Sequence, residues 1–119
     1  MRNCRCGSIW LVCFDPSVGT EIKKTRPALI ISPTDFNSVR SKVTLLPISS
    51  TVIKTKKIAP VVVRIPATRE NGLNVESTIL AIEPNTFDKK RLVKCLGDLE
   101  SDYLKEVKQI LKSYLDLSI

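Results

Sequence analysis

Gly19-Thr-Glu-Ile-Lys-Lys-Thr-Arg-Pro-Ala-Leu-Ile-Ile-Ser32 is a polar loop that runs directly into an apolar segment. The apolar half, Ala28 to Ser32, has the length and composition of a buried strand. Arg26 and Pro27 stand at the junction, and a proline fixes its own φ and pushes the preceding residue towards an extended conformation. The sequence therefore predicts that Arg26 opens the strand from a stiffened backbone, as suits a cation that must be held in one position. A plain surface cation at a strand opening is the alternative interpretation.

The composition indicates a single globular domain spanning residues 1–119. Hydrophobic residues make up 43% of the chain and charged residues 26%, close to globular averages, so disorder is not indicated. The longest apolar runs fall far short of the roughly 20 residues of a membrane span. The N-terminus carries no apolar segment of the signal-peptide type. We therefore expect a cytoplasmic protein that has no contact with membranes.

The charge balance is strongly basic. Nineteen Lys and Arg residues against twelve Asp and Glu residues give a net charge of +7. Such an excess favours polyanionic partners through phosphate neutralisation and counterion release. A solubility role, or a match to an acidic protein, would produce the same balance, so the charge alone does not choose among these.

The chain has no histidine and four cysteines, Cys4, Cys6, Cys13 and Cys95. Cys4 and Cys6 form a Cys-x-Cys pair, but zinc sites usually need four ligands at recognisable spacings, and the other two cysteines are isolated. We therefore expect reduced thiols, no metal site and no cofactor. Without histidine, any catalysis must use arginine, lysine, carboxylates, hydroxyls or cysteines.

Short strands separated by turns occupy most of the chain. Apolar runs and alternation predict strands at Ser8–Phe14, Ala28–Ser32, Ser41–Ile48, Val61–Ile65, Ser77–Glu83 and Lys94–Gly97. Both faces of the first strand are apolar, which predicts that it is well buried. In the third strand, Pro47 predicts an edge position or a bulge near the strand's end.

Three helical segments are also predicted. Thr34–Asn37 is a turn or one helical turn with Thr34 or Asp35 as its cap, and Asp88–Leu92 is a second short helical turn. Five apolar residues recur at helical spacing near the C-terminus: Leu104, Val107, Ile110, Leu111 and Tyr114. They predict an amphipathic helix whose apolar face packs on the core. Several short strands followed by one helix indicate a mostly β protein with some α structure, built on a small barrel-like sheet.

Specific motifs occur in a fixed order along the chain. The first block holds Gly-x-Ile-Trp at Gly7–Trp10, Asp-Pro-x-x-Gly-x-Glu at Asp15–Glu21 and Arg-Pro-Ala-Leu-Ile-Ile at Arg26–Ile31. Leu-Pro-Ile-Ser-Ser, Ser-Thr-Ile-Leu and Thr-Phe-Asp-Lys-Lys-Arg-Leu follow it. With these motifs the chain resembles the MazF/PemK family of toxin ribonucleases, the mRNA interferases of bacterial toxin–antitoxin pairs. The resemblance covers most of the chain.

The resemblance implies a fold, an activity and partners. The fold is a small SH3-like barrel of the PemK/CcdB type with a C-terminal helix, acting as a homodimer. The activity is sequence-specific, metal-independent cleavage of single-stranded RNA, including mRNA, which arrests translation and growth. The partner is a cognate antitoxin protein that blocks the RNA groove. A gyrase-poison type of toxin without catalysis, and a degenerate relative that only binds RNA or antitoxin, are the alternatives.

The resemblance also implies site residues. In one branch of the family an arginine and a hydroxyl residue form the catalytic pair, and they fall here on Arg26 and Ser49. A second branch uses an arginine and an aspartate at positions that are Leu80 and Ile82 here, so that mechanism cannot operate in this chain. Asn85 stands where many relatives have arginine.

Further residues are candidates through their chemistry. An arginine can bond two phosphate oxygens at once, whereas an unassisted serine is a poor base. Glu21 can act as the base or can simply pair with a nearby cation, and Lys24 and Thr25 can orient the phosphate. The aromatic rings can stack on bases or belong to the core. The candidate RNA-binding residues are Trp10, Phe14, Lys23, Ser50, Lys54, Lys56, Lys57 and Asn85.

Overall fold

The computed structural model describes residues 4–14, 25–51 and 61–117. Within them the strands are β1 (Ser8–Cys13), β2 (Thr25–Ile30), β3 (Lys42–Ser49), β4 (Val62–Ile65), β5 (Ser77–Leu80), β6 (Asn85–Asp88) and β7 (Leu92–Asp98). The helical segments are α1 (Thr34–Val39), the short 3₁₀ helix η2 (Lys89–Arg91) and α2 (Ser101–Tyr114). This order confirms the mostly β prediction with a C-terminal helix.

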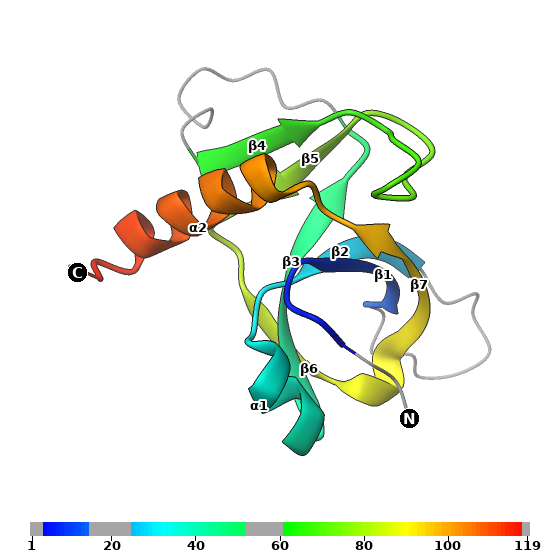
Figure 1. Cartoon of the computed structure of the whole chain (residues 1–119), viewed down its shortest axis with the longest axis vertical. Coiled ribbons are helices and arrows are strands. Elements are labelled where there is room, and N and C mark those ends of the chain that lie inside the picture. Colours follow the sequence, from blue (N-terminus) through cyan, green and yellow to red (C-terminus); the bar gives the residue numbers. More distant parts are fainter. Residues whose placement is uncertain (1–3, 15–24, 52–60, 118–119) are drawn as a thin grey trace.

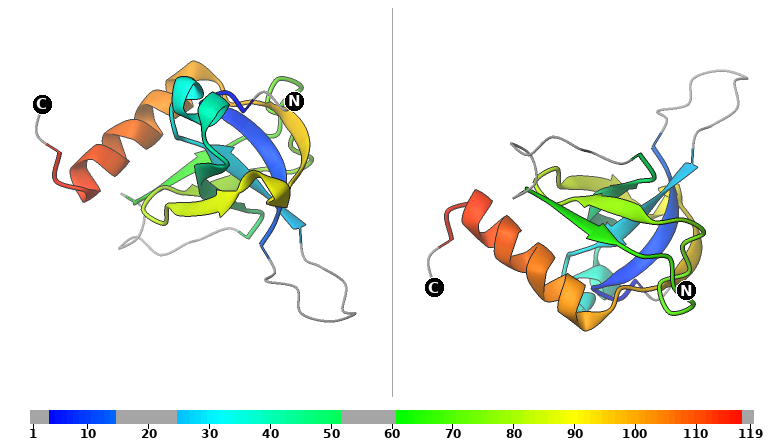
Figure 2. Two further views of the ribbon diagram at one scale, coloured as in Figure 1. Left: turned by 90° about the horizontal axis from the view of Figure 1, so that it is seen from below. Right: turned by 90° about the horizontal axis from the view of Figure 1, so that it is seen from above.

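The strands form one antiparallel sheet of seven strands in the order β4-β5-β3-β2-β1-β7, with β6 paired to β3 beside this path. The sheet curls around the core, while α2 lies across β4 and β5 and α1 lies near β6 (Figure 1). The views from below and above show the same curl, with the terminal helix along one side (Figure 2). Among the described strands β4 and β7 do not pair, so the predicted barrel-like sheet is open.

The strand β3 lies inside the sheet, so the prediction of an edge position for Pro47 is wrong. On one side β3 pairs with β2, where Pro47 is the partner of Ala28. On its other side the partner changes from β6, which ends at the Leu45–Asn85 pair, to β5, which begins at the Ile48–Ile79 pair. Pro47 falls at this changeover, and a residue without a backbone N–H is tolerated where the ladder is interrupted.

Several predicted boundaries shift for identifiable reasons. β2 begins at Thr25 rather than at Ala28, because Thr25, Arg26 and Pro27 pair with β1. β5 stops at Leu80, so Ile82 lies in the turn after the strand. β6, which begins at Asn85, was not predicted.

The predicted cap of α1 is wrong. Pro33 occupies the N-cap position, and no side chain makes a capping hydrogen bond there. The hydroxyl of Thr34 is used elsewhere, since its Oγ1 accepts the backbone N–H of Cys6 at 3.0 Å. A tertiary contact to the N-terminal segment has therefore replaced the local cap.

The core consists of two clusters on opposite faces of the curled sheet. β1 serves both of them: Ile9 belongs to the first, and Trp10 and Val12 belong to the second. Ile9 and Val12 are fully buried, which confirms that both faces of this strand are covered. Each such side chain contributes about 1.5–3 kcal/mol when removed from water.

Helix α2 closes the first cluster. Val107 is fully buried, and Leu104 and Ile110 pack against the same cluster, as the helical spacing predicts. Tyr114 is 56% exposed, so the predicted apolar stripe does not extend into the core at the helix's last turn. No helix in the described ranges is long and apolar enough to cross a membrane.

The N-terminal segment is fastened to β7 and α1. Arg5 donates two hydrogen bonds to Asp98, at 2.8 and 3.0 Å, and these bonds together with the charge of Asp98 raise the pKa of the Arg5 guanidinium. The buried amide of Asn37 donates to the backbone oxygen of Cys4 at 2.7 Å. Cys4 is buried and belongs to the second cluster. No three cysteine or carboxylate groups in the described part of the chain are placed to hold a metal ion.

Candidate active site

A cleft of about 690 Å³ opens between the start of β2, the end of β3, the loop before β5, and β7. This volume lies in the range of ordinary ligand sites. One wall is rich in hydroxyl groups and carries the predicted arginine. Its residues are Thr25, Arg26, Pro27, Ser49, Ser50 and Thr51.

Arg26 and Ser49 are brought to this wall by neighbouring strands. The antiparallel register of β2 and β3 is fixed by the Ala28–Pro47 and Leu29–Leu46 pairs. Continuing that register by two residues places Arg26 opposite Ser49, although they are separated by a long stretch of chain. The predicted catalytic pair therefore lines one cleft.

Arg26 stands inside β2 rather than at the mouth before it. It is the partner of Val12 in β1, so its backbone is held by the sheet as well as by Pro27. Its side chain is exposed, and it forms no ion pair with any acid in the described ranges. A guanidinium held this way can meet a phosphate with two parallel hydrogen bonds.

Ser49 is the last residue of β3 and is half-buried. Its backbone is paired with Thr78 of β5, and its Oγ accepts the N–H of Thr51 at 3.1 Å. The chain therefore turns away immediately after Ser49. The hydroxyl hydrogen is left available to a phosphate oxygen in the cleft.

The facing wall is a loop held together by Asn71, whose side chain is completely buried. Its Oδ1 accepts the N–H groups of Thr68 and Leu73, both at 3.0 Å. Its Nδ2 donates to the backbone oxygen of Pro66 at 2.8 Å and to Glu100 Oε1 at 3.3 Å. One amide thus ties the cleft loop to the start of α2.

Replacing Asn71 with alanine is expected to lower the free energy of unfolding by about 3 kcal/mol, because buried polar groups lose their partners. Urea unfolding measures this change. Asn74→Ala is the matched control, since Asn74 is exposed and its loss is expected to cost less than about 0.5 kcal/mol. Equal stabilities for the two variants would contradict the role given to Asn71.

The floor and far side of the cleft include residues that the sequence analysis missed. Leu11 and Leu96 supply apolar surface, and Asn74 and Lys94 supply polar groups. The register pairs Leu11 with Lys94, and alternation along β7 then puts Leu96 on the same face. No local signal marks these residues. The strand order β2-β1-β7 brings Leu11, Lys94 and Leu96 to the cleft, and the loop before β5 brings Asn74 there.

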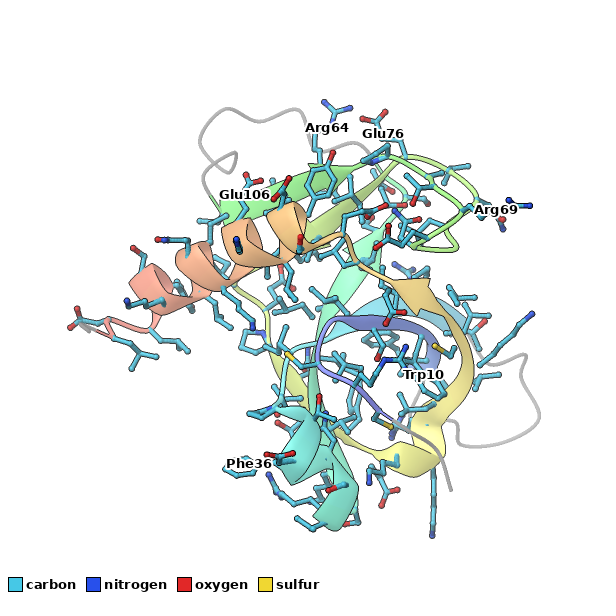
Figure 3. All side chains as sticks on the ribbon, in the orientation of Figure 1. Trp10, Phe36, Arg64, Arg69, Glu76 and Glu106 are labelled. Atoms are coloured by element: carbon cyan, nitrogen blue, oxygen red, sulfur yellow. The ribbon has the colours of Figure 1, made fainter. Side chains whose placement is uncertain are left out.

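The other candidate residues within the described ranges lie outside the cleft. Trp10 is 6% exposed and donates its indole N–H to Ser8 Oγ at 2.9 Å, so it belongs to the core, within the curl of the sheet (Figure 3). Phe14 packs edge-on against Phe87, with ring centroids 5.4 Å apart. Asn85 is exposed at the start of β6 and donates to the backbone oxygen of Glu83. Trp10 therefore offers no free face to a base, which corrects its assignment as an RNA-binding residue.

Six candidates lie outside the described residues. They are Glu21, Lys23, Lys24, Lys54, Lys56 and Lys57.

The family model of PemK-like, MazF-like toxins of type II toxin–antitoxin systems matches residues 5–115. The chain belongs to this family. The match includes every wall of the cleft, so the family extends over the whole candidate site.

Curated and solved relatives agree with this membership. The chain is 30% identical over 118 residues to endoribonuclease MazF9 of Mycobacterium tuberculosis, covering 95% of this chain and 97% of that protein. The structure of MazE–MazF (Form-II) from Deinococcus radiodurans superposes with a TM-score of 0.81 at 28% identity, covering 99% and 100% of the two chains. MazF (Form-I) of the same organism gives a TM-score of 0.76 at 28% identity, covering 95% and 96%.

Proposed function

We propose that this family member is the toxin of a type II toxin–antitoxin pair and acts as a sequence-specific, metal-independent endoribonuclease on single-stranded RNA, including mRNA. The observation that carries the proposal is that Arg26 and Ser49 line one cleft. Relatives named endoribonucleases support the reaction class. Cleavage of mRNA would arrest translation and growth.

The proposed step uses the substrate's own 2′-hydroxyl as nucleophile. Its oxygen attacks the adjacent phosphorus, the proton goes to a base, and the bond from phosphorus to the 5′ oxygen breaks. The leaving oxygen takes up a proton. The upstream RNA fragment then ends in a 2′,3′-cyclic phosphate, and the downstream fragment begins with a 5′-hydroxyl. The transition state carries extra negative charge on the phosphoryl oxygens, and a fixed cation there is often the largest catalytic contribution.

Arg26 is proposed to hold those oxygens. Its charge is permanent, and its planar fork matches two phosphate oxygens. The pairing of β2 with β1 fixes the backbone position from which the Arg26 guanidinium extends. The side chain therefore needs less reorganisation to reach the transition state.

Ser49 is proposed to donate its hydroxyl hydrogen to the same phosphate. Glu21, which precedes β2 in the sequence, is proposed as the base. Thr25, Lys24 and Ser50 are proposed to orient the phosphate, and the lysines at 23, 54, 56 and 57 to follow the RNA backbone. Thr25 and Ser50 lie on the same wall as Arg26, which supports this arrangement.

The proposed partners are a second copy of this chain and a cognate antitoxin. The MazE–MazF complexes solved from Deinococcus radiodurans support the antitoxin, because their MazF chains share this fold over nearly its full length. The net charge of +7 suits both RNA and an acidic protein segment.

The nucleophile is tested with an RNA that carries a single 2′-deoxy nucleotide at a mapped cut. We expect cleavage to be lost at that bond and to continue at an unmodified copy of the same site in the same strand. The intact copy serves as the internal control. Equal cleavage at both sites would show that the 2′-hydroxyl is not the nucleophile.

Ser49→Ala is expected to lower kcat by about 10²-fold, the usual loss when one donor to a transition-state oxyanion is removed. Ser49→Thr keeps the hydroxyl and is expected to restore most of the rate. Single-turnover cleavage of one RNA by the three proteins measures this. Equal defects in the alanine and threonine variants would assign Ser49 a packing role instead.

A further inference from the structure

The far wall of the cleft carries two polar side chains that have no partner among the described residues. Asn74 and Lys94 are both exposed and both line the cleft that holds Arg26 and Ser49. Within the described residues neither makes a hydrogen bond or ion pair. Groups of this kind at the edge of a substrate cleft are available to the substrate.

Asn74 is carried by a firmly held loop. Three residues earlier, Asn71 uses its whole amide to hold the loop, as described above. Gly72 lies directly against the backbone of Leu96, where even a Cβ atom would stand 2.0 Å from the carbonyl oxygen. A free amide on such a support can distinguish base edges, because its donor and acceptor are held in place.

Lys94 lies two strands away from the arginine strand. Leu11 of β1 has Lys94 as its partner on one side and Pro27, next to Arg26, on the other. Neighbouring strands are about 4.8 Å apart, so roughly 10 Å separates the two backbones. Both cations line the same cleft, so a strand of RNA lying across it would meet them at different phosphates.

Apolar surface lies between these polar groups. Leu73 is buried, Leu96 is partly buried, Val75 is 53% exposed, and all three line the cleft. A planar base can lie against such a surface while an amide beside it meets the base edge.

We propose that Asn74 and Lys94 form the recognition wall of the cleft, in which Lys94 binds a phosphate next to the scissile one and Asn74 reads the edge of an adjacent base. The inference rests on the proposed ribonuclease function and adds to it the residues that select the sequence. A phosphate contact positions the strand, and the amide supplies the discrimination.

Asn74 is tested by sequencing the ends produced from a randomised single-stranded RNA pool. Asn74→Ala is expected to relax the base preference at one position of the cut motif by about 5- to 100-fold, the discrimination of one good side-chain–base pair. The other positions are expected to keep their preference. An identical cut motif in the two proteins would overturn the assignment of Asn74.

Lys94 is tested by binding in the Arg26→Ala background, where RNA is not cut. Lys94→Gln is expected to weaken binding of all sequences alike and to reduce the slope of log K against log salt by about 0.7, the value for one phosphate contact to a single strand. Lys105→Gln on the exposed face of α2 is the charge-matched control and is expected to keep the slope. Equal slopes for the two glutamine variants would overturn the assignment of Lys94.

Failure of the inference is distinguishable from failure of the proposed function. If the wild type does not cut RNA, the ribonuclease proposal fails, and selection of bound sequences from the same pool replaces end mapping. A shift in the bound sequences on Asn74→Ala would still support the recognition wall. If the wild type cuts but neither variant changes motif or slope, only the recognition wall fails.

Discussion

Arg26→Ala is expected to reduce RNA cleavage by about 10³-fold or more, because it removes the fixed charge at the phosphoryl oxygens. The side chain is exposed and carries no described ion pair, so the fold should be retained. Single-turnover kinetics on one mapped site measures the loss, and a thermal melt within about 2 °C of wild type shows that the protein is still folded.

Arg26→Lys separates charge from geometry. Lysine keeps the positive charge but cannot present the planar fork, so an intermediate rate is expected. A fully active alanine variant would remove Arg26 from the reaction. An alanine variant that is inactive only because it has unfolded would be recognised by its melt.

Among the described glycines, Gly72 is the one at which a change to alanine is expected to cost the most stability. Gly72 has φ +72°, a conformation that is strained for alanine, and its Cβ would lie 2.0 Å from the Leu96 carbonyl oxygen. The carbonyl oxygen belongs to the backbone and the added Cβ is fixed directly to it, so neither atom can turn away. We expect a loss of about 3 kcal/mol or more in unfolding free energy and a melting temperature lower by roughly 10 °C.

Gly7→Ala is the matched comparison for this prediction. Gly7 also has a positive φ, +93°, but its Cβ would meet only the tip of the Leu104 side chain, at 3.0 Å. The strain is similar and the clash is softer, so a loss of about 1 kcal/mol is expected. Equal losses in the two variants would mean that the contact between the cleft loop and β7 contributes little.

The loop contact also links stability to function. Gly72 and Gly97 let the loop and β7 approach closely, since a Cβ on Gly97 would stand 2.2 Å from the Glu70 oxygen. The contact between this loop and β7 positions the cleft wall that holds Asn74. Gly72→Ala is therefore expected to change the cut motif as well as the melting temperature.

Local pattern was enough to predict most strands and the terminal helix. Alternation placed β1, since its two faces enter two different cores, and the spacing of Leu104 and Val107 placed α2. Short stretches of sequence carry these signals, because buried side chains recur every second residue in a strand and about every 3.6 residues in a helix.

Tertiary contacts decided the parts that the pattern predicted wrongly. β2 begins before the predicted start at Ala28, because Arg26 pairs with Val12 of β1. The Thr34 hydroxyl accepts the backbone N–H of Cys6 and does not cap its own helix. Pro47 sits inside the sheet because β3 changes partners at that point. Each of these outcomes depends on a segment distant in sequence, which no local pattern contains.

The candidate site also contains residues that the sequence predicted and residues that it did not. Arg26 and Ser49 were predicted from the resemblance to the MazF/PemK family, and in the structure both line one wall of the cleft. Asn74 and Lys94 carry no sequence signal of their own. Lys94 reaches the cleft through strand order, and Asn74 reaches it on the loop that packs against Leu96. Trp10 shows the opposite case, since a motif residue has a structural role in the core.

The most direct test of the central claim is incubation of the purified wild-type protein and Arg26→Ala with a long single-stranded RNA in excess EDTA. We predict discrete fragments from the wild type alone, ending in 2′,3′-cyclic phosphate and 5′-hydroxyl groups. Intact RNA in both reactions, with both proteins folded, would contradict the account and favour a toxin that acts by binding alone.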